Sequence, residues 1–149
     1  MSTFRFFVPL AIALAGCSAE PGAPAIEVSD AWARATAPGQ SSGAIYATIV
    51  NRGGADSLTG VASSDGMAML HSSATQRGVS RMRMVEAMPI KAGSNSAAQT
   101  VTLAPGGTHV MLTALAKPLI AGDKLKLTLR FAKAGERELT VSVVAPGAR

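Results

Sequence analysis

Histidine and methionine side chains recur together in this sequence at spacings of two residues. His109 and Met111 form a His-x-Met pair, and Met67, Met69 and His71 follow the same alternation. In a β-strand every second side chain points to the same face, so each group would present its imidazole and thioethers together. A further pair, Met82 and Met84, alternates in the same way.

Imidazole and thioether groups together form a ligand set for a soft metal ion. Thioethers select Cu(I) over zinc, calcium or magnesium. The chain has a single cysteine, which excludes zinc fingers, iron–sulfur sites and a disulfide framework within the chain. A methionine also fills cores, and a histidine is often only a surface or hydrogen-bonded residue, so spacing alone leaves both interpretations open.

The elements that position these residues are predicted to be β-strands. The strand 124–131 shows the pattern most clearly, because four apolar side chains alternate with Lys, Thr and Arg. Short runs of this kind, separated by Gly, Pro and Asn turns, indicate an all-β sandwich in a single domain. The predicted strands are 26–28, 44–51, 57–62, 67–72, 79–85, 100–103, 109–113, 124–131 and 138–144.

The N-terminus is predicted to be an export signal. Residues 1–16 carry one positive charge, Arg5, followed by an apolar run, and Leu-Ala-Gly precedes Cys17 as in a bacterial lipobox. We therefore expect residues 1–16 to be removed, Cys17 to be lipidated and residues 17–25 to form a flexible tether. The folded domain would span 26–145, with a short tail at 146–149. The alternative is an ordinary signal peptide cleaved near Ala19.

The charge of the chain limits its partners. The formal net charge is +5. Without Arg5 it is +4, a modest excess that suits an anionic membrane surface or an acidic protein partner. It is too weak to indicate a nucleic-acid partner, and the export signal argues against one. Arg77, Arg81 and Arg83 surround Met82, either as a solvated basic edge or as a docking patch for an acidic partner.

The histidine and methionine pattern resembles that of the periplasmic PCu(A)C copper chaperones. Ten residues separate His71 from Met82, as in that family, and His109-x-Met111 follows after a longer gap. The surplus residues fall in a Gly/Ser-rich turn at 91–98, where an insertion is cheap. Further segments of similarity occur in order along the chain: Asp30-Ala-Trp32-Ala-Arg34, Ala44-x-Tyr46, Asn51, Asp56-x-Leu58 and Leu119-x-x-Gly122-Asp123.

The resemblance implies a cupredoxin-like, Greek-key β-sandwich that binds one Cu(I) through His71, Met82, His109 and Met111. Met84, Met69 and Met67 are auxiliary ligand candidates, and Met88 is assigned to packing. The implied function is copper delivery to the dinuclear copper centre of cytochrome c oxidase, with the copper-bearing subunit and Sco-type thiol proteins as partners. The protein would lie on the periplasmic side, held to a bacterial membrane by its lipid. Ser18 slightly favours the outer membrane.

Two other functions compete with the copper chaperone. The chain could be a metal-free lipoprotein whose sandwich serves as a protein-interaction module. An enzyme is not expected, because the two histidines, Asp65 and Glu86 form no recognisable set of nucleophile, base and orienting group.

Overall fold

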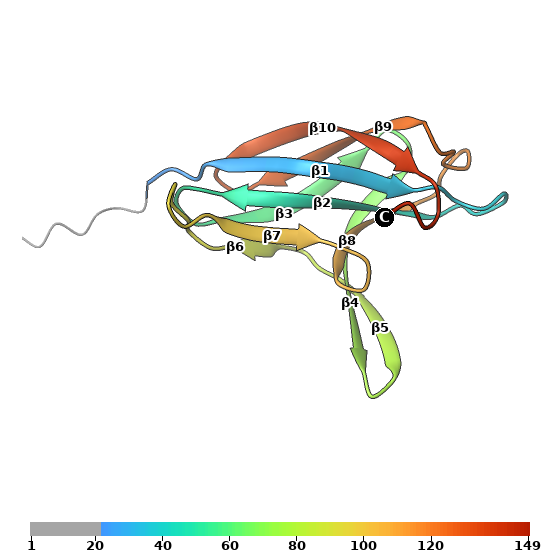
Figure 1. Cartoon of the computed structure of the whole chain (residues 1–149), viewed down its shortest axis with the longest axis horizontal. Coiled ribbons are helices and arrows are strands. Elements are labelled where there is room, and N and C mark those ends of the chain that lie inside the picture. Colours follow the sequence, from blue (N-terminus) through green and yellow to red (C-terminus); the bar gives the residue numbers. More distant parts are fainter. Residues whose placement is uncertain (1–21) are drawn as a thin grey trace, which may run out of the picture.

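The computed structural model describes residues 22–149, so the predicted signal and Cys17 lie outside the described residues. Within residues 22–149 the chain forms strands and no helix, and hence no helix suited to crossing a membrane. Figure 1 shows the elements: β1 Ile26–Arg34, β2 Gly43–Asn51, β3 Asp56–Ser63, β4 Met67–Gln76, β5 Val79–Met84, β6 Met88–Ile90, β7 Gln99–Leu103, β8 Thr108–Thr113, β9 Lys124–Phe131 and β10 Gly135–Val144.

The strands form one continuous, curled sheet in the order β5-β4-β8-β2-β1-β10-β9-β3-β6, with β7 also paired to β2. All neighbours are antiparallel except β1 and β10. The curled sheet encloses a single apolar core to which strands from both halves contribute, including Ile45, Leu70, Val110, Leu127 and Val141. The prediction of an all-β, cupredoxin-like sandwich is therefore confirmed.

Alternating hydrophobicity sets which face of each strand is buried. In β9, Leu125, Leu127, Leu129 and Phe131 are buried, as predicted, while the lysines between them are exposed. On β10, Glu138 and Glu136 pair with Lys126 and Arg130 across the exposed face.

One strand, β6, is not among the strands that the sequence predicts. β6 has only three residues and contains Pro89, which cannot donate a ladder hydrogen bond. Its position at the end of the strand order makes this tolerable, because the proline lies on an edge strand. Met88 packs against the core, as predicted. β1 and β4 are also longer than predicted, and β1 continues past an irregularity between Ser29 and Trp32.

A break between β7 and β8 brings the His-x-Met pair into place. Both strands run antiparallel to β2, β7 against residues 47–51 and β8 against residues 43–45. Residues 104–107 form a tight loop between them. In this loop the Gly107 N–H donates to the Ala104 carbonyl, and the Ala104 N–H donates to the Thr108 carbonyl. The loop ends where β8 begins at Thr108, so His109 and Met111 lie at the start of β8.

The β4–β5 hairpin extends beyond the rest of the sheet (Figure 1). Its two-residue turn, Arg77-Gly78, has positive φ angles of 51° and 79°, as a type I′ turn requires. All six residues of β5 are exposed. The hairpin therefore presents Met82 and Met84 on a projecting edge.

Asn51 fixes the opposite end of β2. Its side chain is fully buried and makes four hydrogen bonds to the backbone of neighbouring loops. The loop after β6 passes so close that a Cβ on Gly93 would lie 2.1 Å from the Asn51 carbonyl oxygen, so only glycine fits there.

Candidate metal centre

Three neighbouring strands bring the predicted ligands to one face of the sheet. In the β4–β8 register, His71 lies opposite His109, and Met69 lies opposite Met111. In the β4–β5 register, His71 lies opposite Met84. Residues directly opposite one another point to the same face, so β5, β4 and β8 present their imidazoles and thioethers together.

His109 is held in a defined orientation. Its Nδ1 lies 3.1 Å from the Gly107 carbonyl oxygen. Because a carbonyl can only accept, Nδ1 carries the proton and Nε2 is left with a free lone pair. The same carbonyl accepts the backbone N–H of Ser73 on β4. A metal-binding imidazole is commonly oriented by a hydrogen bond from its second nitrogen. Here the acceptor is the Gly107 carbonyl in the loop between β7 and β8.

His71 has an unsatisfied ring nitrogen. Its Nδ1 is buried and has no hydrogen-bond partner among the described residues. The two imidazole rings lie with their centroids 6.4 Å apart. A buried polar atom without a partner is costly, and a metal ion would satisfy it. The donor set therefore fits a metal ion between these strands.

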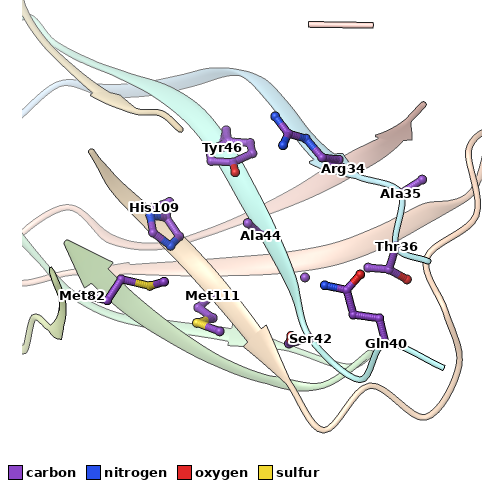
Figure 2. Close-up of a pocket in the computed structure, with 11 residues that line it drawn as sticks. Arg34, Ala35, Thr36, Gln40, Ser42, Ala44, Tyr46, Met82, His109 and Met111 are labelled. Carbon is purple, nitrogen blue, oxygen red and sulfur yellow. The ribbon is translucent and has the colours of Figure 1, made fainter. Parts of the chain in front are cut away.

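The methionine side chains line two different surface cavities. Met82, His109 and Met111 line a cavity of about 340 Å³, in which Figure 2 shows the three side chains on the same side. Met69 and Met84 line a second cavity of about 190 Å³ together with Glu86. Of the predicted ligands, the first cavity thus gathers three, and His71 lies on the adjacent strand.

The auxiliary candidates differ in their placement. Met84 is directly opposite His71, and Met69 is directly opposite Met111. Met67 lies one pair further along, opposite Thr113, and its side chain is 62% exposed. Met82 is opposite Ser73, diagonal to His71, and is 61% exposed.

The available ligands are soft. In the part of the chain that the structure describes, no three His, Cys, Asp or Glu side chains gather where they could hold a metal. A centre built on this sheet face must therefore use thioethers besides its two imidazoles, which is the donor chemistry of Cu(I).

Sequence reasoning did not recognise the aromatic support of the centre. The rings of Trp32 and Tyr46 lie with centroids 4.5 Å apart, and the Tyr46 ring lies 6.2 Å from that of His109. Tyr46 is 7% exposed. Trp32 and Tyr46 are cross-strand partners on β1 and β2. Together with His109 and His71, their rings form a row across neighbouring strands in which each ring lies near the next. Both aromatic residues belong to segments that resemble the copper chaperone family, Asp30-Ala-Trp32-Ala-Arg34 and Ala44-x-Tyr46.

Two of the three arginines near Met82 do not share its face. Arg81 and Arg83 alternate with Met82 along β5, so they point to the other side of the hairpin, where they lie opposite Ala74 and Ser72. Arg77 is in the hairpin turn. Arg81 and Arg83 therefore lie on the opposite face of the exposed β4–β5 hairpin from Met82 and Met84.

Comparison with known proteins identifies the family. The family model described as "Putative lipoprotein LpqE-like" matches residues 26–143. The chain belongs to the LpqE-like family. A relative from Leifsonia xyli subsp. xyli (strain CTCB07), "Putative lipoprotein Lxx21020", is 35% identical over 138 residues, which cover 89% of this chain and 79% of the relative.

Solved structures place this LpqE-like protein among the PCuAC domains. The copper-bound PCuAC domain from PmoF2 is 31% identical, with a TM-score of 0.65, and the match covers 81% of this chain and 93% of that domain. The Cu(I) form of DR1885 from Deinococcus radiodurans is 29% identical, with a TM-score of 0.56, and the match covers 88% of this chain and 82% of that protein. The predicted family resemblance is confirmed.

Proposed function

We propose that this protein binds one Cu(I) per chain through His71, Met82, His109 and Met111 and acts as a copper chaperone. The observation that carries the proposal is the paired imidazoles. His71 has a buried ring nitrogen without a hydrogen-bond partner in the described part of the chain, and the Nδ1 contact of His109 with Gly107 leaves its Nε2 free. Both lie on a sheet face rich in thioethers. The copper-bound PCuAC relatives support the choice of metal.

A carrier role is favoured over a redox or catalytic one. Blue-copper electron-transfer sites use a cysteine thiolate, and the sole cysteine of this chain, Cys17, precedes the folded domain. Four neutral ligands would leave a bound Cu(I) with its single positive charge. Such a site can hold copper and then yield it to thiolate ligands, which neutralise that charge, so transfer requires no enzyme.

The proposed recipients are the copper-bearing subunit of cytochrome c oxidase and Sco-type thiol proteins. This assignment rests on the family resemblance. Arg77, Arg81 and Arg83 are the proposed docking patch for an acidic surface of such a partner. Because Arg81 and Arg83 lie on the face of the hairpin away from Met82, the patch would act by attracting the partner, and the proposed copper-binding face would remain open.

The proposed location is the periplasmic side of a bacterial membrane, with lipid on Cys17 as the anchor. The lipoprotein names of the family and of the Leifsonia relative support it. The tether of residues 17–25 would let the domain reach partners near the membrane surface. The weak preference for the outer membrane rests on Ser18 alone.

Anaerobic titration of the mature domain with Cu(I) against a competing chelator tests the proposal. We expect one tightly bound equivalent, and a loss of affinity of about 100-fold in His109→Ala, since a loss of about 2.7 kcal/mol corresponds to that factor. Met88→Leu is the control, because Met88 packs against the core. If the protein is instead a metal-free interaction module, no stoichiometric copper will bind and His109→Ala will change only stability.

A further inference from the structure

The cavity beside the copper ligands has a second wall, which the proposed metal site does not use. Ala44 on β2 lies opposite Met111 on β8, and the next β2 residue, Ile45, pairs with Ala33 on β1. Arg34 therefore follows on β1 beside Ala44. Figure 2 shows Met82, His109 and Met111 on one side of the cavity, and Arg34, Thr36 and Gln40 on the other.

Small residues create the hollow between these walls. Ser42 and Ala44 line the cavity with short side chains, which fill little of the space between the proposed copper ligands and Arg34. The resulting volume of about 340 Å³ lies at the lower end of the range typical of ligand pockets, roughly 300–1,000 Å³. It is large enough for a ligand side chain from another protein.

Arg34 gives this cavity a fixed positive charge. Among residues 22–149, no Asp or Glu lines the cavity, and the ion pairs found there belong to other cations: Arg52, Lys126 and Arg130. A Cu(I) held by neutral ligands would add a second positive charge on the opposite wall. Two cations that flank a solvent-accessible hollow favour an anion between them.

The backbone around Arg34 is held in place. The Ala35 N–H donates to the Val144 carbonyl at 2.9 Å, and the Thr36 N–H donates to the Leu119 carbonyl at 3.0 Å. The Thr36 hydroxyl oxygen accepts the Leu119 N–H at 3.0 Å. Arg34 thus projects from a fixed strand end, as a positioning residue should.

We propose that this cavity receives a cysteine thiolate of the protein that takes the copper away, with Arg34 as the residue that positions it. The inference rests on the proposed copper-carrier function and names the chemistry of the acceptor. Among biological anions, thiolate matches both features of the cavity, because its charge pairs with the guanidinium and its softness matches Cu(I). A carboxylate would satisfy only the first.

The transfer is a ligand exchange without electron transfer. The acceptor thiol loses its proton to water, and its thiolate forms a bond to copper as one copper–thioether bond breaks. Met82 is the natural first leaving ligand, because its side chain is 61% exposed and lines the cavity. A second acceptor thiolate then displaces the remaining ligands, and copper stays Cu(I) throughout.

Stopped-flow transfer from the Cu(I)-loaded mature domain to two acceptors tests the inference. One acceptor is a two-cysteine peptide, and the other is neocuproine, a neutral nitrogen chelator. We expect Arg34→Gln to slow transfer to the peptide about two- to fivefold, as loss of a solvent-exposed charge pair predicts, and to leave transfer to neocuproine unchanged. Arg34→Lys keeps the charge and should retain most of the rate.

Arg52→Gln is the matched control, because Arg52 follows the far end of β2 and should change neither rate. Raising the salt concentration should bring the wild-type rate toward that of Arg34→Gln. Equal rates to the peptide, or equal slowing to both acceptors, would overturn the role of Arg34. Cu(I) affinity measured on the same samples distinguishes failure of the Arg34 proposal from failure of the carrier function. A chain that binds no Cu(I) refutes the carrier function itself.

Discussion

At the scale of single residues, the candidate centre depends on which nitrogen and sulfur atoms remain available. The Gly107 carbonyl commits one nitrogen of His109 and frees the other. The buried Nδ1 of His71 has no hydrogen-bond partner within residues 22–149. The two histidines that we propose as ligands therefore have different surroundings.

Met82 and Met84 can be separated by matched substitutions. Both side chains are 61% exposed and both lie on the same strand, but only Met82 lines the cavity with His109 and Met111. We expect Met82→Leu to weaken Cu(I) binding about tenfold or more, equivalent to about 1.4 kcal/mol, and Met84→Leu to leave it nearly unchanged. Competition titration measures both. A larger effect from Met84→Leu would assign the thioether ligand to the position opposite His71.

At the scale of elements, the carboxylate of Asp56 joins the start of β3 to the β9–β10 turn. It is 6% exposed and accepts the backbone N–H groups of Ser57, Lys133 and Ala134 at 2.8–2.9 Å. Burial by itself would raise its pKa, but these hydrogen bonds and the charge of Lys133 together hold the pKa below its ordinary value.

This lowered pKa predicts a stability that depends on acid pH. The contribution of Asp56 is fully present above the ordinary carboxyl pKa of about 3.9 and is lost as pH falls through the lower folded-state value. Asp56→Asn should cost about 1–2 kcal/mol at pH 7 and flatten the fall of unfolding free energy below pH 4. Denaturant unfolding from pH 2 to 7 measures this. A parallel pH profile in the variant would contradict the assignment.

The sequence predicts well which side chains share a strand face. In 124–131 and in His109-x-Met111 every second residue has the same character, and in a strand every second side chain points to the same face. It does not predict strand order, and the position of Arg34 beside Ala44 and Met111 depends on that order. The length of the β4–β5 hairpin was also underestimated, because the polar residues after Ser72 lack an apolar face. Three-residue β6, with its proline, carries too little signal to be found.

At the scale of the whole molecule, the proposed copper-binding face and the basic face of the β4–β5 hairpin are separate surfaces. Without Arg5, which lies in the predicted signal, the formal net charge is +4, and we expect a general attraction to acidic surfaces to which the hairpin arginines contribute. Electrostatic attraction of this kind mainly accelerates encounter, so it should affect the rate of copper transfer more than its equilibrium.

Charge reversal tests the docking patch. We expect Arg81→Glu together with Arg83→Glu to slow copper transfer to a Sco-type thiol protein at low salt, while Cu(I) affinity stays the same. The difference should disappear near 1 M salt, where the Debye length falls to about 3 Å. Arg52→Glu with Lys91→Glu is the control, because both residues lie near Asn51 at the other end of β2. Transfer rates that do not differ at any ionic strength would remove the patch from the account.

The central claim is that Cu(I) is held by two imidazoles and thioether sulfur on the face shared by β4, β5 and β8. X-ray absorption at the copper edge of the anaerobically loaded domain tests it most directly. We expect two nitrogen and two sulfur neighbours of copper, with one sulfur lost in Met111→Leu and one nitrogen lost in His71→Ala. A first shell without sulfur, or one unchanged by both substitutions, would contradict it.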